Sequence, residues 1–174
     1  MTDQELKDLV ASLAVAQAKT DAQIAKTNAT LKSIGIQLGG ISKNNGDVAE
    51  EFFYNTLRKK PVIAGIEFDS VNHNLLRSRG KLEKEFDIVL INGSSVALIE
   101  VKYKVHLNDV EQAEQQVGYY RELFPEHRDY RIYTGIAGMS VPASVADAAR
   151  KRGQFVLKQV GKLIEVDAQA MRAF

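Results

Sequence analysis

Two different patterns of apolar residues divide this chain. From Leu6 to Ile41, residues recur at alternating steps of four and three, which is the spacing of a coiled-coil seam. A helix with so narrow an apolar stripe gains little alone, so we expect it to pair with other copies of the chain. A single amphipathic helix folded back on its own domain is the other interpretation of the pattern. The seam positions are Leu6, Val10, Leu13, Gln17, Thr20, Ile24, Thr27, Leu31, Ile34, Leu38 and Ile41.

Shorter elements follow the seam. Glycines at 35, 39 and 40, together with the polar run 42–46, predict a break in the helix. Residues 47–59 then predict a second helix, whose apolar face includes Phe52, Phe53 and Leu57. We therefore expect two domains, a coiled-coil helix in residues 1–45 and an α/β domain in residues 46–174.

A β-hairpin is expected at the centre of the second domain. Residues 86–91 and 96–102 are apolar runs, and residues 92–95, Asn-Gly-Ser-Ser, form the turn between them. Glu100 and Lys102 share a face because side chains alternate along a strand. A turn at residues 93–94, or a loop of residues 92–95, sets Asp87 opposite Glu100. A turn at residues 92–93 pairs Asp87 with Leu98 instead, and both registers leave the three charges on one face, whereas a three-residue loop separates them.

The other elements suggest an α/β fold. Residues 62–70 predict a first strand, and a helix capped by Asn108 or Asp109 runs to Phe124, where Pro125 stops it. Strand 130–139, helix 142–152 and two short strands in residues 154–166 complete the chain. The order after the coiled coil is therefore αβββαβαβ.

Composition narrows the functional classes. The chain has 174 residues, of which 45% are hydrophobic and 26% charged, as in a globular domain with an appendage. Its net charge of +1 is too small to attract nucleic acid through the overall electrostatic potential, so any basic patch is local. The absence of cysteine excludes disulfides, thiol nucleophiles and Cys-ligated zinc. With no signal peptide and no apolar run of about 20 residues, we expect a cytoplasmic protein without a membrane span.

Asp87, Glu100 and Lys102 are the residues most suggestive of chemistry. Strands this apolar are usually covered on both faces, and ionised groups there are costly unless they are paired or bind a metal. Two neighbouring carboxylates repel each other, and a hard divalent cation relieves that repulsion. Lys102 could then stabilise the charge that develops on a phosphate under attack. The alternative is an exposed hairpin face with an ordinary Glu–Lys pair.

These residues resemble the PD-(D/E)XK nuclease superfamily, in which an acid on one core strand is followed by Glu-x-Lys on the next. The resemblance implies a restriction-endonuclease-like fold, with a mixed central sheet flanked by helices. It implies a metal site formed by Asp87, Glu100 and the carbonyl of Val101. It also implies a glutamate on the first core helix, which matches Glu50 after Gly46, with Glu51 as the competing choice. Gln116 and Tyr120 resemble a Gln-x-x-x-Tyr element of some branches, although core packing also explains Tyr120.

The function implied is hydrolysis of phosphodiester bonds, of DNA above all, with Mg²⁺ as the cofactor and Mn²⁺ as a substitute. The expected catalytic residues are Glu50, Asp87, Glu100, Lys102 and Gln116. Basic residues near the hairpin are expected to contact the phosphate backbone, or else to form a solvated strand edge. They are Arg77, Arg79, Lys81, Lys84 and Lys104. The alternative function is an oligomeric binding module for nucleic acid or protein that keeps the nuclease fold without turnover.

Overall fold

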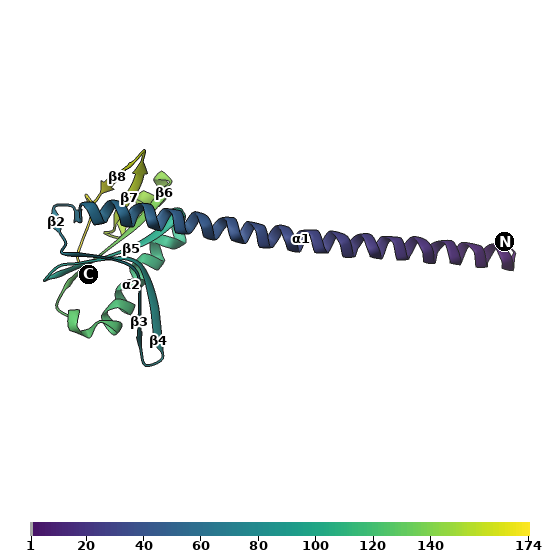
Figure 1. The fold of residues 1–174 in the computed structure, drawn as a ribbon, viewed down its shortest axis with the longest axis horizontal. Coiled ribbons are helices and arrows are strands. Elements are labelled where there is room, and N and C mark those ends of the chain that lie inside the picture. The colour runs from purple at the N-terminus through teal and green to yellow at the C-terminus, as the bar shows by residue number, and fades with distance from the viewer. Residues whose placement is uncertain (1) are drawn as a thin grey trace. The chain divides into compact units, whose positions relative to one another are not determined.

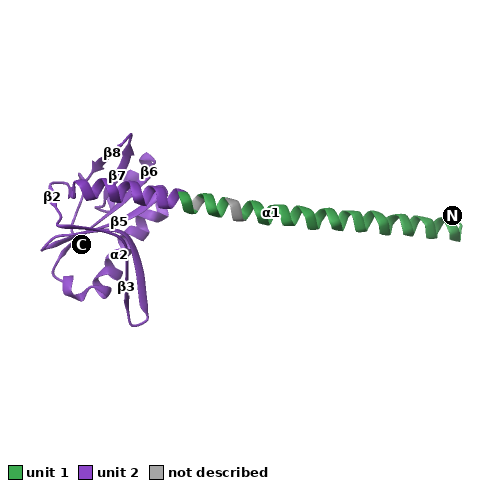
Figure 2. Cartoon of the chain, in the orientation of Figure 1, with its two compact units in different colours: residues 1–44 green, residues 45–174 purple. Residues whose placement is uncertain are grey.

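The structure is a computed structural model that describes residues 2–174, apart from the side chains of residues 36, 37 and 42. It divides into two compact units, residues 1–44 and residues 45–174 (Figure 2). In the described residues, no helix is long and apolar enough to cross a membrane. The expected α/β class, with a long N-terminal helix and a mixed sheet, is confirmed (Figure 1).

The first helix, α1, runs without interruption from Asp3 to Lys59. The predicted break at residues 42–46 is therefore wrong, and residues 47–59 are the last turns of α1 rather than a separate helix. Each glycine inside a helix costs about 1 kcal/mol relative to alanine, which weakens the helix but does not end it. No proline removes a backbone donor before Pro61, and Ala49, Phe53 and Leu57 anchor the end of α1 in the core.

The second unit contains a six-stranded sheet in the order β3-β4-β5-β6-β7-β8. Strands β5 and β6 are parallel, as are β6 and β7, while the other neighbours are antiparallel. The strands of this sheet are β3 (Ser70–Arg79), β4 (Leu82–Ile91), β5 (Ser95–Lys104), β6 (Arg131–Ser140), β7 (Phe155–Val160) and β8 (Leu163–Asp167).

Helices cover both faces of this sheet. The end of α1 packs on one face, where Phe53 joins Ile88, Ile99 and other buried residues. On the other face, α2 (Leu107–Leu123) packs through Tyr120 and Leu123, and α3 (Ala143–Lys151) lies beside it. The short helix η1 (Pro125–His127) follows α2. Residues 88–90 of β4 and 95–101 of β5 are consequently buried on both sides, as their apolar sequences predicted.

Two local predictions are wrong. Residues 62–70 form a small hairpin of β1 (Val62–Ile63) and β2 (Ile66–Glu67), because Ala64 and Gly65 have positive φ and turn the chain sharply. The first long strand is β3, over polar residues that the sequence placed in a loop or strand edge. Helix α2 begins at Leu107 after the cap residue His106, and Asp109 instead accepts a hydrogen bond from the His106 N–H at 2.7 Å.

Candidate active site

The hairpin of β4 and β5 has the predicted register with a loop of residues 92–95. Ile91 pairs with Val96 and Ile88 with Ile99, so the next position along the same register sets Asp87 opposite Glu100. The turn is held by Asn92, whose side-chain oxygen accepts the N–H groups of Ser94 and Ser95 at 3.0 and 2.7 Å. This turn fixes which face Asp87 shares with Glu100 and Lys102.

Beyond Ile88, strand β4 separates from β5. The paired positions of β4 and β5 end at Ile88 and Ile99, whereas β4 stays paired with β3 as far as Leu82. Where the backbone of β4 leaves, the carboxylate of Asp87 accepts the N–H of Val101 at 2.8 Å. The carboxylate of Asp87 thus takes the place of a backbone acceptor on β4 at the point where the pairing of the two strands ends.

A change of side-chain direction accompanies the separation. Ile88 belongs to the core beneath α1, whereas Phe86, two residues earlier on β4, packs under α2. On β3, Asn74 lies between the pairs His73–Ile88 and Leu75–Phe86, and it has a positive φ of 49°. The twist at Asn74 and Asp87 carries the end of the β3–β4 hairpin toward α2 (Figure 1).

Glu100 is the centre of the polar contacts. Its side chain is only 9% exposed, so the alternative of an exposed charged hairpin face does not hold for this residue. One carboxylate oxygen accepts a hydrogen bond from Lys102 Nζ at 2.5 Å, and the other accepts one from Gln116 Nε2 on α2. Gln116 is 2% exposed, and its own side-chain oxygen has no hydrogen-bond partner among the described residues. The structure therefore brings Asp87, Glu100, Lys102 and Gln116 together.

The carboxylates of this cluster are not neutralised by a simple ion pair, because two acids share one lysine. Burial raises the pKa of Asp87 to about 7, and the negative charges of Glu100 and Glu50 add to the increase. Partial burial alone would lower the pKa of Lys102. The hydrogen bond and charge of Glu100, with the charges of Asp87 and Asp109, outweigh that effect and raise the pKa above its usual value. Lys102 therefore remains an ammonium group, while Asp87 resists ionisation without further positive charge.

Glu50 lies on α1 near this cluster, close enough for its charge to affect Asp87. It lines a cavity of about 370 Å³ together with Glu51, Tyr54, His73 and Asn74. Glu50 is half-buried and Glu51 is exposed, which favours Glu50 of the two predicted choices. His73, to which the sequence assigned no role, stacks on Tyr54 with ring centroids 4.9 Å apart, and its Nε2 lies 3.5 Å from Glu50. No sequence spacing indicated this contact, because it joins a helix to a strand whose existence was missed.

The basic residues divide into two groups. Arg77 forms an ion pair with Glu126 at 3.0 Å and lies over the ring of Phe124, while Arg79 donates to the backbone oxygen of Glu122. These two arginines therefore hold the β3–β4 hairpin against α2 and η1. In contrast, Lys81 at the hairpin end and Lys104 at the end of β5 are exposed, while Lys84 on β4 is half-buried with its ammonium group 5.9 Å from the ring centroid of Tyr119.

The donor atoms suit a hard cation, but they are few. Asp87 and Glu100 offer carboxylate oxygens and Val101 a backbone oxygen, which are the ligand types that Mg²⁺ prefers. Within residues 2–174, no group of three acidic or histidine side chains is arranged to hold a metal ion. Mg²⁺ would therefore be held by two carboxylates, one carbonyl, water and substrate oxygens, as is common for this ion.

Comparison with solved structures finds matches at low sequence identity, including the following two. A repair endonuclease from Pyrococcus abyssi matches at 18% sequence identity and a TM-score of 0.47, over 63% of this chain and 46% of that chain. The EndoMS–dsDNA2 complex matches at 17% identity and a TM-score of 0.42, over 64% of this chain and 44% of that chain. The matches thus cover less than half of each of those proteins. No protein-family model and no curated protein matches the chain.

Proposed function

We propose that unit 2 is a metal-dependent nuclease of the PD-(D/E)XK type that hydrolyses phosphodiester bonds of DNA. The observation that carries this proposal is the pair of acids at the strand separation, beside a protonated lysine. Burial raises the pKa of Asp87 to about 7, so holding both negative charges near neutral pH is unfavourable, and additional positive charge would stabilise them. A binding module without turnover has no physical need for such a pair.

The roles of the residues follow from their contacts. Asp87, Glu100 and the carbonyl of Val101 would hold Mg²⁺ or Mn²⁺, which supplies polarisation of the phosphodiester and a lowered pKa for a bound water. Gln116 fixes the carboxylate of Glu100 by donating to one of its oxygens. Lys102 keeps its proton and stabilises negative charge on the phosphate oxygens in the transition state. Glu50 orients the attacking water, and Lys81, Lys84 and Lys104 attract the phosphate backbone.

A cleavage assay tests this proposal directly. Duplex DNA, single-stranded DNA and RNA are incubated with the full chain in EDTA, Mg²⁺ or Mn²⁺. We expect metal-dependent cleavage of DNA, and a loss of at least about 100-fold in the variants Asp87→Ala and Lys102→Ala. The control Lys162→Ala changes an exposed lysine between β7 and β8 and should retain full activity. If Asp87→Ala and Lys102→Ala cleave as well as wild type, this site is not the catalytic site.

We also propose that unit 1 joins copies of the chain. Its seam residues are highly exposed, with Val10 at 58% and Leu13, Leu31 and Leu38 at 60% each. A row of exposed apolar residues on one helix is stabilised when a second helix covers it. Light scattering of the full chain should give a multiple of the 19.3 kDa chain mass. The double variant Leu13→Glu/Leu31→Glu should give 19.3 kDa without loss of metal-dependent cleavage, since it leaves unit 2 unchanged.

A further inference from the structure

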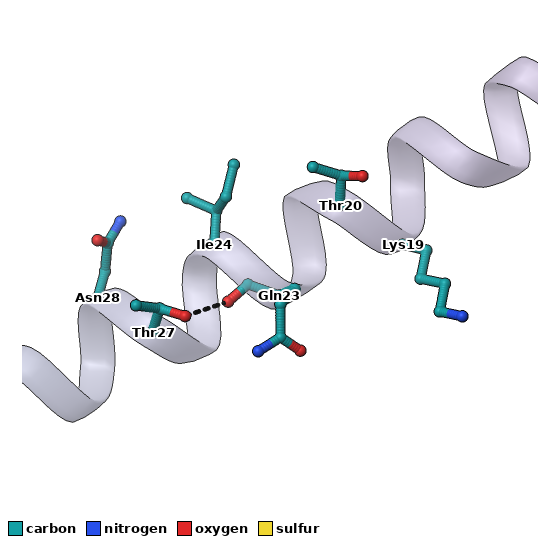
Figure 3. A pocket seen from close by; sticks show the side chains of 6 residues that line it. All are labelled: Lys19, Thr20, Gln23, Ile24, Thr27 and Asn28. Carbon is teal, nitrogen blue, oxygen red and sulfur yellow. Dashed lines mark hydrogen bonds between the residues drawn. The ribbon is translucent and has the colours of Figure 1, made fainter.

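The surface of unit 1 has the form of a coiled-coil interface. Thr20, Gln23, Ile24 and Thr27 lie at positions i, i+3, i+4 and i+7 and surround a shallow hollow on α1 (Figure 3). Four residues at this spacing form the hole that receives one side chain from a facing helix. The hydroxyl groups of Thr20 and Thr27 donate to the backbone oxygens of Ala16 and Gln23 at 3.0 and 2.9 Å. These threonines therefore need no polar partner on another helix.

In a parallel arrangement, the two ends of the seam would favour different numbers of chains. In heptad terms, Val10 is an a residue, and Leu6 and Leu13 are d residues. A β-branched residue at a with leucine at d favours a parallel dimer. At the other end of the seam the order is reversed. Leucines stand at a, in positions 31 and 38, and isoleucines at d, in positions 34 and 41. That arrangement favours parallel assemblies of more than two chains.

An antiparallel arrangement removes the contradiction, because an a residue then faces a d residue of the other copy. One register pairs leucine with leucine and a β-branched residue with a β-branched residue, and it places two polar side chains together near the middle. Its layers are Leu6–Leu38, Val10–Ile34, Leu13–Leu31, Gln17–Thr27 and Thr20–Ile24. A shift by one heptad in one direction would instead bury Gln17 against Ile34 and Thr20 against Leu31. A shift in the other direction would leave Ile34 and Leu38 without a facing seam residue, so this register is better matched than either neighbour.

Charge favours the same orientation. The first turns of α1 carry Asp3, Glu5 and Asp8 against the single Lys7, a net charge of −2. The last part of unit 1 carries three lysines at 26, 32 and 43 with no acid in residues 22–44, a net charge of +3. Parallel helices would place like charges together at both ends, whereas antiparallel helices place each negative end beside a positive one.

We propose that residues 3–41 pair with a second copy of the chain as an antiparallel two-stranded coiled coil in which Leu13 faces Leu31. This inference rests on the self-association proposed for unit 1 and adds its orientation, register and copy number. Because unit 2 follows unit 1 in the chain, the second units of the two copies follow opposite ends of the paired helices.

Disulfide exchange tests the register, and the chain is suited to it because it contains no cysteine. The full-length variants Leu13→Cys, with an added affinity tag, and Leu31→Cys are mixed in a glutathione redox buffer. On a non-reducing gel, we expect the mixed disulfide to exceed either disulfide between identical chains by at least tenfold. Val10→Cys with Ile34→Cys should behave in the same way. The control pair Leu13→Cys and Leu38→Cys is offset by seven residues, or about 10 Å, and should cross-link weakly.

A cysteine in the seam could weaken the pairing of the helices. A label outside the seam therefore provides an independent test of their orientation. Pyrene attached to Glu5→Cys should give no excimer emission in a dimer, because antiparallel copies hold these labels about 50 Å apart. Predominant disulfides between identical chains, or strong excimer emission, would overturn the antiparallel orientation. A wild-type mass of 19.3 kDa by light scattering would overturn self-association itself. Neither outcome affects the nuclease proposal, which the cleavage assay tests separately.

Discussion

Unit 2 contains two clusters of charged side chains whose arrangements differ in kind. Where α2, α3 and β8 meet, Arg152 lies 2.6 Å from Glu114 and 2.9 Å from Glu111, and Arg150 lies 2.8 Å from Asp167. Every contact joins opposite charges. A hydrogen bond from Arg150 lowers the pKa of Asp167, and the bonds to Asp167 and Glu114 raise the pKa of Arg150 and Arg152, so the charged forms of these three residues are favoured.

At the strand separation, by contrast, two acids and one lysine are collected in a less exposed place, and the pKa of Asp87 rises to about 7. In the arginine cluster, each arginine is paired with acidic side chains of the same unit. In the acidic cluster, two carboxylates share a single lysine. The comparison shows that the number of charges says little, whereas the sign of the pKa change distinguishes a structural cluster from a candidate site.

The largest change in cleavage activity should come from removing the hydrogen bond that supports Glu100 in the acidic cluster. Gln116→Ala takes away the amide that donates to Glu100 and should lower metal-dependent cleavage by about 10- to 100-fold, because the carboxylate loses its fixed orientation. The matched control is Gln115→Ala, one residue earlier on the exposed side of α2, which should retain activity. Equal rates for the two variants would show that Gln116 has no part in catalysis.

The second prediction concerns pH. The folded-state pKa of Asp87, about 7, lies above its usual value of 3.8, so the folded protein binds this proton more tightly than the unfolded chain does. The stabilisation from Asp87 is therefore complete below pH 3.8 and is lost as the pH rises through 7. In EDTA, the free energy of unfolding of wild type should fall relative to that of Asp87→Asn across this range, as measured by urea denaturation.

Mg²⁺ at pH 7 provides the complementary measurement. It should raise the melting temperature of wild type and leave that of Asp87→Asn nearly unchanged, because only the wild type has both carboxylates. A difference between wild type and Asp87→Asn that does not vary between pH 4 and 7 would contradict the raised pKa.

The smallest effect is expected in the arginine cluster. Arg152→Ala removes both ion pairs to α2, but the side chain is 40% exposed, so the free energy of unfolding should fall only slightly. Cleavage should remain within about twofold of wild type. Arg128→Ala, at a side chain 81% exposed, is the control for simple loss of positive charge. A large loss of activity in Arg152→Ala would mean that the two clusters are not independent.

The sequence predicted the central hairpin well because its signals are local. Alternation along the strands and the Asn92 turn determine the register, and the register brings Asp87, Glu100 and Lys102 together. Gln116 followed from helical spacing combined with the resemblance to a nuclease superfamily. Residues 88–90 of β4 and 95–101 of β5 are buried on both faces, which is the condition under which apolar runs are most informative.

Other features depend on contacts between distant segments, and the sequence does not reveal them. Strand β3 is an edge strand in which every residue is exposed or half-buried, so it lacks the apolar alternation that identifies strands. The assignment of Arg77 to nucleic acid did not anticipate its ion pair with Glu126, which lies 49 positions away. The end of α1 is anchored in the core of unit 2 through Ala49, Phe53 and Leu57. Helix propensities of the residues around the glycines do not reveal this anchoring.

The departure of β4 from its neighbour leaves the Val101 N–H bonded to a carboxylate instead of a backbone oxygen. The exchange of this one amide proton with solvent deuterium consequently depends on a side chain that titrates near neutrality. In the metal-free protein, Val101 should exchange faster in Asp87→Ala than in wild type, while the paired Ile99 amide keeps its rate. A single resonance therefore reports the state of the acid from which the whole site is built.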